Sequence, residues 1–200
     1  MREEENISKL VGLEPDFIGF IFYEKSNRFA GDDFSPSITS VIPGEIMKVG
    51  VFVNASPEYV EQKIARYDLD FIQLHGGESI EYCCRFFDKG IKIIKAFSVD
   101  EDFDFSETNG YNNCCEYFMF DTKTPLFGGS GKKFNWSVLR RYTGNKPFFL
   151  SGGIGPDDSN NILEFRHELL FALDLNSRFE QLPGLKNIEL LQPFFNQIRS

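Results

Sequence analysis

The sequence predicts an α/β fold, a (β/α)8 TIM barrel whose first β-strand is missing from this chain, with seven parallel strands and about eight helices. Three observations predict it. Short apolar runs recur roughly every 20–30 residues between amphipathic helical segments, the period of strand–helix units in a parallel sheet. The runs lack apolar–polar alternation, as strands buried on both faces do. The pattern begins with a helix, whereas a complete barrel begins with a strand.

Composition and length place the predicted strands. Each run is rich in β-branched or aromatic residues and is followed by glycine or polar residues. An open doubly wound sheet could also hold seven strands, but the order of strands and helices fits a barrel without its first strand. The predicted strands are Phe17–Phe22, Lys48–Val53, Phe71–Leu74, Ile91–Ala96, Tyr117–Phe120, Pro147–Leu150 and Leu170–Asp174.

Capping residues mark the predicted helices. Ser56 can accept a hydrogen bond from the first helical turn, and Pro57 suits the first helical position. Within the last helix, Pro193 predicts a kink or a late restart. The polar stretch 99–114 receives no firm assignment. The expected helices are residues 2–12, one after Ser56, one after Ser79, Trp136–Tyr142 after Asn135, residues 157–165 and one after Asn187.

The acidic composition limits the classes of function. The 200 residues suit one domain spanning 1–200, and 21 basic against 30 acidic residues give a net charge of −9. That charge disfavours binding to nucleic acid or an anionic membrane, although local groups can still hold a small anion. No apolar run approaches the ~20 residues of a membrane span. The polar start is unlike a signal peptide, and the four cysteines lack C-x-x-C spacing, so we expect reduced thiols in a cytoplasmic protein.

Three loops after successive late strands carry glycine or small polar residues. They read GGSGKKF at 128–134, SGGIGPDD at 151–158 and DLNSRFE at 174–180. Small residues let backbone N–H groups approach an oxyanion, and barrels build phosphate sites from their final loops and a short helix N-terminus. One such loop could be only a tight turn. Together the three loops favour a phosphate site.

Ionisable residues also follow the strands. Asp121 ends the run YFMFD, where a carboxyl beside a partly apolar cavity can act as a general acid or can simply bond its own turn. Arg28 could hold a carboxylate with two hydrogen bonds or could be a solvated surface residue. His75 in QLHGGES could orient a substrate or cap a loop. With no second histidine nearby, no metal site is expected.

The ordered set of motifs resembles the phosphoribosylanthranilate isomerase family of tryptophan biosynthesis. The resemblance covers nearly the whole chain. It rests on the segments GFIFYEKSNRF, VGVFVN, DFIQLHGGES, IKAF, FDTKT followed by GGSGKKFNW, LSGGI, and DLNSRFE followed by PGLKN. It implies a barrel enzyme, without metal or organic cofactor, that catalyses an Amadori rearrangement of a small phosphosugar. The aminoaldose N-(5-phosphoribosyl)anthranilate would be converted to the corresponding aminoketose.

The resemblance also implies roles for individual residues. Asp121 would be the general acid that protonates the ring oxygen, and Arg28 would grip the anthranilate carboxylate. His75 and Asp174 would bind the substrate, with Asp174 beside the sugar hydroxyls. The phosphate would lie against Gly129, Ser130, Gly131, Gly152, Gly153, Asn176 and Ser177.

One departure from the family pattern concerns the amino terminus. Members begin with a strand ending in Lys-x-Cys-Gly, and that cysteine is the general base; here MREEENISKL stands where the following residues would fall. We expect Met1 to be an internal residue of a longer protein, and this chain to be impaired in catalysis. Without the strand, its two neighbours would present unpaired edges, which predicts weak stability or self-association through those edges.

Two other interpretations remain open. A different phosphosugar enzyme on the same barrel, such as a pentose-phosphate epimerase or indole-glycerol-phosphate synthase, would share the phosphate loops. Arg28 and Asp121 fit an anthranilate ligand better, and an epimerase would be expected to place metal-binding histidines and aspartates at several strand ends. A non-catalytic relative that only binds phosphate is the second interpretation.

Overall fold

A curled parallel sheet forms the centre of the computed structural model, which describes residues 1–122 and 135–199. Each strand pairs in parallel with the next one along the chain, in the order β1 to β7. The prediction of a barrel-type α/β fold with seven parallel strands is confirmed. The strands are β1 (Phe17–Ile21), β2 (Met47–Phe52), β3 (Phe71–Leu74), β4 (Lys92–Val99), β5 (Tyr117–Thr122), β6 (Phe148–Leu150) and β7 (Leu170–Leu173).

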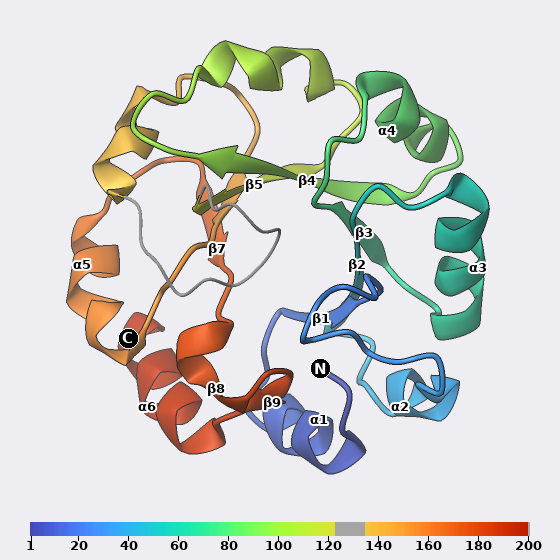
Figure 1. Cartoon of the computed structure of the whole chain (residues 1–200). Coiled ribbons are helices and arrows are strands. Elements are labelled where there is room, and N and C mark those ends of the chain that lie inside the picture. The colour runs from blue at the N-terminus through green and yellow to red at the C-terminus, as the bar shows by residue number, and fades with distance from the viewer. Residues whose placement is uncertain (123–134, 200) are drawn as a thin grey trace.

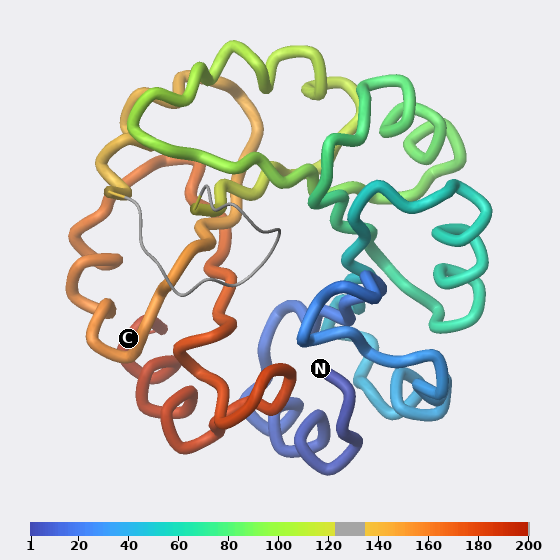
Figure 2. The backbone as a smooth tube through the Cα atoms, in the orientation of Figure 1, coloured from blue at the N-terminus to red at the C-terminus, as the bar shows by residue number. Residues whose placement is uncertain are grey.

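Helices surround the sheet on its outer side, and the backbone traces a ring in Figure 2. They cover the outward faces of the strands and bury them, so the strand runs read as apolar throughout. The α-helices are α1 (Glu4–Val11), α2 (Pro36–Ser40), α3 (Pro57–Tyr67), α4 (Ile80–Phe87), α5 (Ser159–Glu164) and α6 (Ile188–Ile198). The 3₁₀ turns are η1 (Phe105–Tyr111), η2 (Trp136–Arg141), η3 (Pro156–Asp158) and η4 (Ser177–Phe179).

The capping predictions hold at four helix starts. The side chains of Ser56, Ser79, Asn135 and Asn187 each accept a hydrogen bond from a backbone N–H of the first turn. The late restart predicted at Pro193 was wrong, because α6 runs through this residue as one helix, and the alternative, a kink there, stays a prediction. Proline has no N–H, so the carbonyl four residues before Pro193 lacks its helical hydrogen bond. That carbonyl lies in the first turn of α6, where the chain can adjust to the proline ring.

Two apolar layers make up the core. Outward-facing residues of the sheet pack against the helices, and a smaller inner cluster fills the barrel. Phe17, at the start of β1, reaches across the interior to Phe71 and Phe149, with ring centroids 5.6 and 5.1 Å apart. These rings close the end of the barrel where the strands begin. The inner cluster is Val49, Phe71, Ile94, Ala96, Met119 and Phe149.

The sheet does not close into a complete ring among the described residues. β1 and β7 are its edge strands, and neither pairs with the other. A hairpin of β8 (Glu180–Leu182) and β9 (Leu185–Lys186) lies beside α1 and the first residues of the chain (Figure 1). The Asn6 amide donates to the Lys186 carbonyl at 2.8 Å and accepts from the Lys186 N–H at 2.7 Å. These two hydrogen bonds join the two ends of the fold.

Candidate active site

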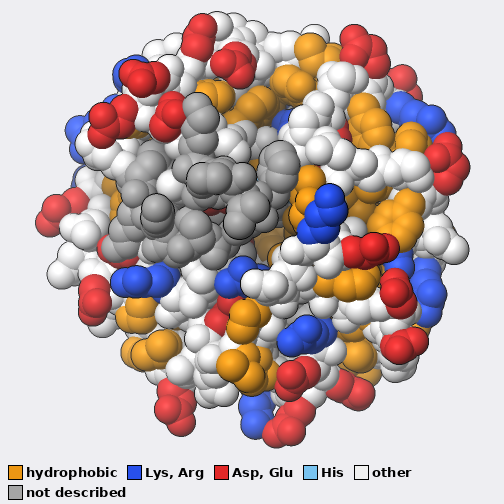
Figure 3. Space-filling model, in the orientation of Figure 1, with side chains coloured by type: hydrophobic (Ala, Val, Ile, Leu, Met, Phe, Trp, Pro, Cys, Tyr) orange, Lys and Arg blue, Asp and Glu red, His pale blue; other side chains and the backbone are white. Residues whose placement is uncertain are grey.

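A cavity of about 580 Å³ lies beside β1 and β7 and reaches the carboxyl ends of the strands. Residues near the amino ends of β1 and β7, among them Asp16, Phe17 and Leu170, line it as well. The carboxyl end of a barrel carries its loops. Figure 3 shows acidic and basic side chains interspersed around the edge of one face of the molecule. Every predicted site residue that the structure describes lines this one cavity: Arg28, His75, Asp121, Gly152, Gly153, Asp174, Asn176 and Ser177.

Asp121 ends β5 and faces His75. The His75 Nε2 lies 3.2 Å from Asp121 Oδ2, and both side chains are largely buried. The Gln73 amide nitrogen lies 2.7 Å from His75 Nδ1. An amide nitrogen can only donate, so Nδ1 accepts, and a neutral His75 carries its proton on Nε2, facing the carboxylate. The predicted role of His75, to orient a substrate or to cap a loop, stays a prediction, and the structure adds its contact with Asp121.

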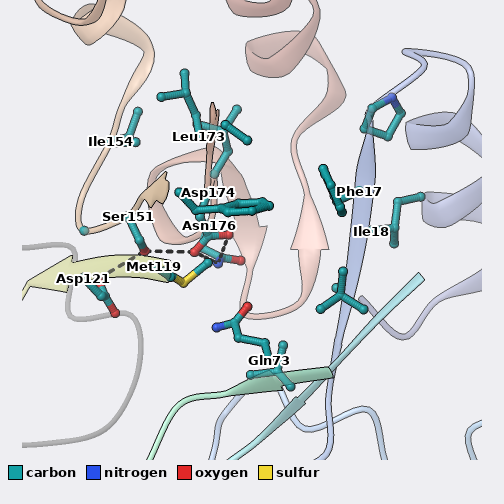
Figure 4. Close-up of a pocket in the computed structure, with 18 of the residues that line it drawn as sticks. Phe17, Ile18, Gln73, Met119, Asp121, Ser151, Ile154, Leu173, Asp174 and Asn176 are labelled. Carbon is teal, nitrogen blue, oxygen red and sulfur yellow. Dashed lines mark hydrogen bonds between the residues drawn. The ribbon is translucent and has the colours of Figure 1, made fainter. Parts of the chain in front are cut away.

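Ser151 joins two carboxyl groups. Its hydroxyl oxygen lies 3.1 Å from Asp121 Oδ1 and 2.9 Å from Asp174 Oδ2. Asp174 in turn accepts two 3.0 Å bonds from the Asn176 amide. Figure 4 shows this line of hydrogen bonds running from Asp121 through Ser151 and Asp174 to Asn176. The end of β5 and the residues that follow β6 and β7 thus meet in one network.

Burial and neighbouring charges shift the pKa values of Asp174 in this network and of Lys186 next to it. Burial raises the pKa of the Asp174 carboxyl above its ordinary value, Lys186 opposes the rise, and Asp121 adds to it. Lys186 lies beneath the loop after β7, where its ammonium donates to the Leu175 carbonyl at 2.6 Å and to the Asn176 side chain at 2.9 Å. Burial lowers the pKa of Lys186, against the attraction of Glu180 and Asp174.

Arg28 is held by Glu180 at the edge of the cavity. Its Nη2 lies 2.7 Å from Glu180 Oε2, and its Nε donates to the same carboxylate at 2.8 Å. The Arg28 side chain is only 13% exposed, so the interpretation as a solvated surface residue was wrong. Two of the guanidinium nitrogens contact Glu180, and a ligand carboxylate would have to use the remaining Nη1 edge.

A buried ammonium supports the loop that carries His75. Lys95 Nζ donates to the Leu74 and Gly76 carbonyls at 3.1 and 2.8 Å, on either side of His75 in the chain. It also pairs with Glu78 Oε2 at 3.1 Å, and both side chains are almost wholly buried. Glu78 accepts from the Gly76 N–H, so cation and carboxylate together fix this turn.

The predicted phosphate loops lie beside this network. Gly152 and Gly153 have φ values of 95° and 69°, in the region that favours glycine, and both line the cavity. Asn176 and Ser177 line it at the start of η4. Gly129, Ser130 and Gly131 lie outside the described residues. Two of the three predicted phosphate loops therefore reach the cavity, and their binding of phosphate stays a prediction.

Searches for other kinds of site gave two findings. In the described part of the chain, no three His, Cys, Asp or Glu side chains form a group that could hold a metal ion. Over the same residues, no helix has the length and apolar character needed to cross a membrane.

Sequence reasoning gave no role to several residues of the site. Ser151 was noted only as a residue at the end of a strand, although its place before two glycines could have suggested more. Gln73 and Lys186 lie within apolar or turn segments, and Glu180 lies in the last motif. No periodicity marks the partner of Glu180, because its contact with Arg28 joins segments 152 residues apart in the chain.

The comparisons with known proteins agree with this geometry. The family model described as N-(5'phosphoribosyl)anthranilate (PRA) isomerase matches residues 1–197. A protein of Parabacteroides distasonis named N-(5'-phosphoribosyl)anthranilate isomerase is 45% identical, over 99% of this chain and 90% of the relative. The crystal structure of phosphoribosyl anthranilate isomerase from Thermotoga maritima has a TM-score of 0.87 and 32% identity, covering 100% of this chain and 95% of that one.

A second solved structure bears on the ligand. It is a phosphoribosyl anthranilate isomerase in complex with reduced 1-(o-carboxyphenylamino)-1-deoxyribulose 5-phosphate, with a TM-score of 0.84 and 28% identity. This chain is covered in full, and the solved chain over 95% of its length. The matched family model, the identity to named relatives and the shared fold lead to one conclusion: the chain belongs to the N-(5'-phosphoribosyl)anthranilate isomerase family.

Proposed function

We propose that this protein converts N-(5-phosphoribosyl)anthranilate to 1-(2-carboxyphenylamino)-1-deoxyribulose 5-phosphate, as a cofactor-independent isomerase of tryptophan biosynthesis. The observation that carries the proposal is that an aspartate, a histidine, a guanidinium and two glycine-lined turns line one cavity at the loop end of the barrel. The membership of the family supports the same reaction. The interspersed charges around the cavity face fit a small anionic sugar better than a polyanion.

In the proposed mechanism, Asp121 protonates the ring oxygen of the furanose, and the bond from that oxygen to C1 breaks. A base then removes the proton from C2, and the resulting enolamine tautomerises to the ketone. His75 orients the Asp121 carboxyl through their 3.2 Å contact, and Asp174 binds the sugar hydroxyls. Positioned proton transfer of this kind contributes about 10²–10⁴ in rate.

The two ends of the substrate are bound apart from the reacting carbons. We infer that the Nη1 edge of Arg28 takes the anthranilate carboxylate, while Glu180 holds the other edge. The backbone N–H groups of Gly152 and Gly153, with Asn176 and Ser177, take the phosphate. The loop Gly129–Gly131 completes this site in the proposal.

The general base of the proposed reaction is the cysteine of a strand ending in Lys-x-Cys-Gly. The printed sequence contains no such motif. We therefore expect that a form extended at its amino terminus by such a strand turns over the fluorescent substrate about 10²-fold faster or more than residues 1–200. An equal rate in both forms would refute this assignment of the base.

A direct assay tests the function itself. The extended form should lose about 10²–10⁴ in kcat when Asp121→Asn is introduced, because the amide cannot give up a proton to the ring oxygen. Asp102→Asn, an exposed change beyond β4, is the matched control and should leave kcat unaltered. Binding of product without turnover in the extended form would favour the non-catalytic alternative. Turnover of another phosphosugar would favour the different enzyme on the same barrel.

We also propose that residues 1–200 act as one cytoplasmic domain that can self-associate through the edges of β1 and β7. Unpaired strand edges are templates for pairing with another chain, and neither edge strand pairs with a further strand of the described sheet. The edge of β1 is only partly occupied, by a bridge from Ile21 to Phe29 and by the Met1 amino group, which donates to the Gly19 carbonyl at 3.3 Å. Size-exclusion chromatography over a range of protein concentrations measures this. We expect a concentration-dependent dimer, and a monomer at every concentration would contradict the proposal.

A further inference from the structure

We propose that Ser151 relays a proton from Asp174 to Asp121, so that Asp174 stores the proton that the general acid uses. This inference rests on the proposed function, since it assigns the source of the acid's proton. The three groups come from three successive loops and lie in one line of hydrogen bonds (Figure 4).

Counting hydrogen atoms leads to this assignment. Ser151 Oγ lies within bonding distance of Asp121 Oδ1 at 3.1 Å and of Asp174 Oδ2 at 2.9 Å. A hydroxyl has one hydrogen, and an ionised carboxylate has none to give. Both contacts can be hydrogen bonds only when one of the two carboxyl groups is protonated. The bridge is therefore complete with a single proton shared between two acids.

The surroundings favour Asp174 as the protonated partner. Asp121 accepts a bond from the Thr122 N–H at 2.8 Å and faces His75 Nε2 at 3.2 Å, and both contacts suit a carboxylate. Among residues 1–122 and 135–199, the charged and titratable groups that act on Asp174 are Lys186, Asp121 and His75. Burial raises the pKa of Asp174 despite the positive charge of Lys186. Burial also lowers the pKa of Lys186.

The route of the proton follows from the geometry. In the substrate-free protein the shared proton is on Asp174, and Asp121 is a carboxylate. When substrate is bound, the Oγ–H bond of Ser151 breaks as an O–H bond forms on Asp121, and the O–H bond of Asp174 breaks as the Ser151 hydroxyl is restored. Asp121 then gives this proton to the ring oxygen, which leaves both acids as carboxylates. Asp174 regains its proton from water that enters the open cavity, which it lines. No proton is gained or lost by the serine over the cycle.

Asp174 and Ser151 are held in place for this task. The Asn176 amide donates to both oxygens of Asp174 at 3.0 Å, and Lys186 Nζ fixes Asn176 at 2.9 Å. Ser151 directly follows β6 and is buried, and its N–H donates to the Phe120 carbonyl at 2.9 Å. The hydroxyl therefore has little freedom to leave the line between the two acids.

Infrared spectroscopy of the substrate-free protein tests where the proton resides. The difference spectrum between the protein and its Asp174→Asn variant at neutral pH should contain the carbonyl band of a protonated carboxyl. The matched control, Asp102→Asn, changes an exposed acid and should give only ionised-carboxylate bands. If Asp174→Asn also gives only ionised-carboxylate bands, Asp174 stores no proton and the proposal fails. This measurement needs no turnover, so its result is independent of the proposed function.

Kinetics of the amino-terminally extended form test the relay. Ser151→Ala should lower kcat by about 10²-fold with little change in KM, because the acid is recharged slowly while substrate binding is kept. Imidazole buffer should restore kcat in proportion to its concentration by supplying the proton directly, whereas a serine that only positioned Asp121 would give no such rescue. Ser98→Ala, on the neighbouring strand in register with Asp121, should match the unaltered protein in both respects. An unchanged kcat for Ser151→Ala, or a loss that imidazole does not restore, would overturn the relay.

Discussion

Gly152 lies where the loop after β6 passes closest to β5. Its φ of 95° belongs to the region that favours glycine, and a Cβ there would meet the Thr122 N at 2.9 Å as well as the Thr122 side chain. The same backbone position brings the loop to the cavity and to the proposed phosphate. Glycine is therefore required at this position for two reasons, its positive φ and the lack of space for a side chain.

Gly152→Ala should separate these demands when it is compared with Gly31→Ala. Gly31 has a φ of 100° but open space around its Cβ position. Gly31→Ala should cost about 1–2 kcal/mol of unfolding free energy from backbone conformation alone. Gly152→Ala should cost about 1–3 kcal/mol more because of the added crowding against Thr122. Urea unfolding measures both, and equal losses would show that crowding plays no part.

A residue of the site could be predicted from the sequence only where its position relative to a predicted strand was sufficient evidence. Asp121 and Gly152 stand directly at the end of a strand, and strand ends meet at one rim of a barrel. The role of Ser151 depends on two carboxyl groups, one 30 and one 23 residues away in the chain, and that of Arg28 on Glu180, 152 residues away. Pairings at such separations leave no local pattern in the sequence.

Among the elements, the turn after β3 shows how a loop becomes rigid. Lys95, on the neighbouring strand, binds the carbonyls before and after His75, and Glu78 balances its charge. Both charged groups are almost wholly buried. Removing one member of such a pair leaves the other buried without a partner, which is the costly case.

Lys95→Met should therefore lower the unfolding free energy by about 3–5 kcal/mol, measured by urea unfolding. The double variant Lys95→Met/Glu78→Gln should lose less than the sum of the two single changes, because no buried charge is then left unpaired. Lys92→Met removes an ammonium from the exposed end of the same strand, 5.3 Å from the Phe71 ring centroid, and should change stability by less than about 0.5 kcal/mol. Additive losses in the double variant would contradict the pairing.

Element boundaries were predicted well where caps and apolar runs coincide. The helix after Ser56 and the strand Phe71–Leu74 begin and end close to their expected residues. The stretch 99–114 escaped assignment because it holds the end of β4 and a 3₁₀ turn, η1, whose residues are largely polar. The hairpin of β8 and β9 was missed because strands of three and two residues show no recognisable period.

The whole molecule is held across its open side by few contacts. The Asn6 side chain bonds both the N–H and the carbonyl of Lys186, which joins α1 to the hairpin near the other end of the chain. Asn6 is buried, so no water replaces these bonds when they are lost. The barrel architecture itself was predictable, because seven apolar runs at a regular period allow few other arrangements.

Asn6→Ala should lower the thermal unfolding temperature. The change leaves two buried backbone groups of Lys186 unsatisfied, at about 1–3 kcal/mol for each. Asn160→Ala, an exposed asparagine in α5, is the matched control and should leave stability unchanged or slightly raised because alanine favours helix. Differential scanning calorimetry measures the unfolding temperature of both variants. Similar changes in the two would mean that the hydrogen bonds between Asn6 and Lys186 do not stabilise the fold.

The order of the strands has a consequence for how the chain is made. Every strand from β1 to β7 pairs with the strand that precedes or follows it in the chain. During translation, each newly emerged strand–helix unit can dock on the one already in place, without waiting for a distant partner. The sheet can thus grow stepwise as the ribosome delivers it, whereas contacts between the two ends of the chain, such as those of Asn6 with Lys186 and of Arg28 with Glu180, must wait for the end of synthesis.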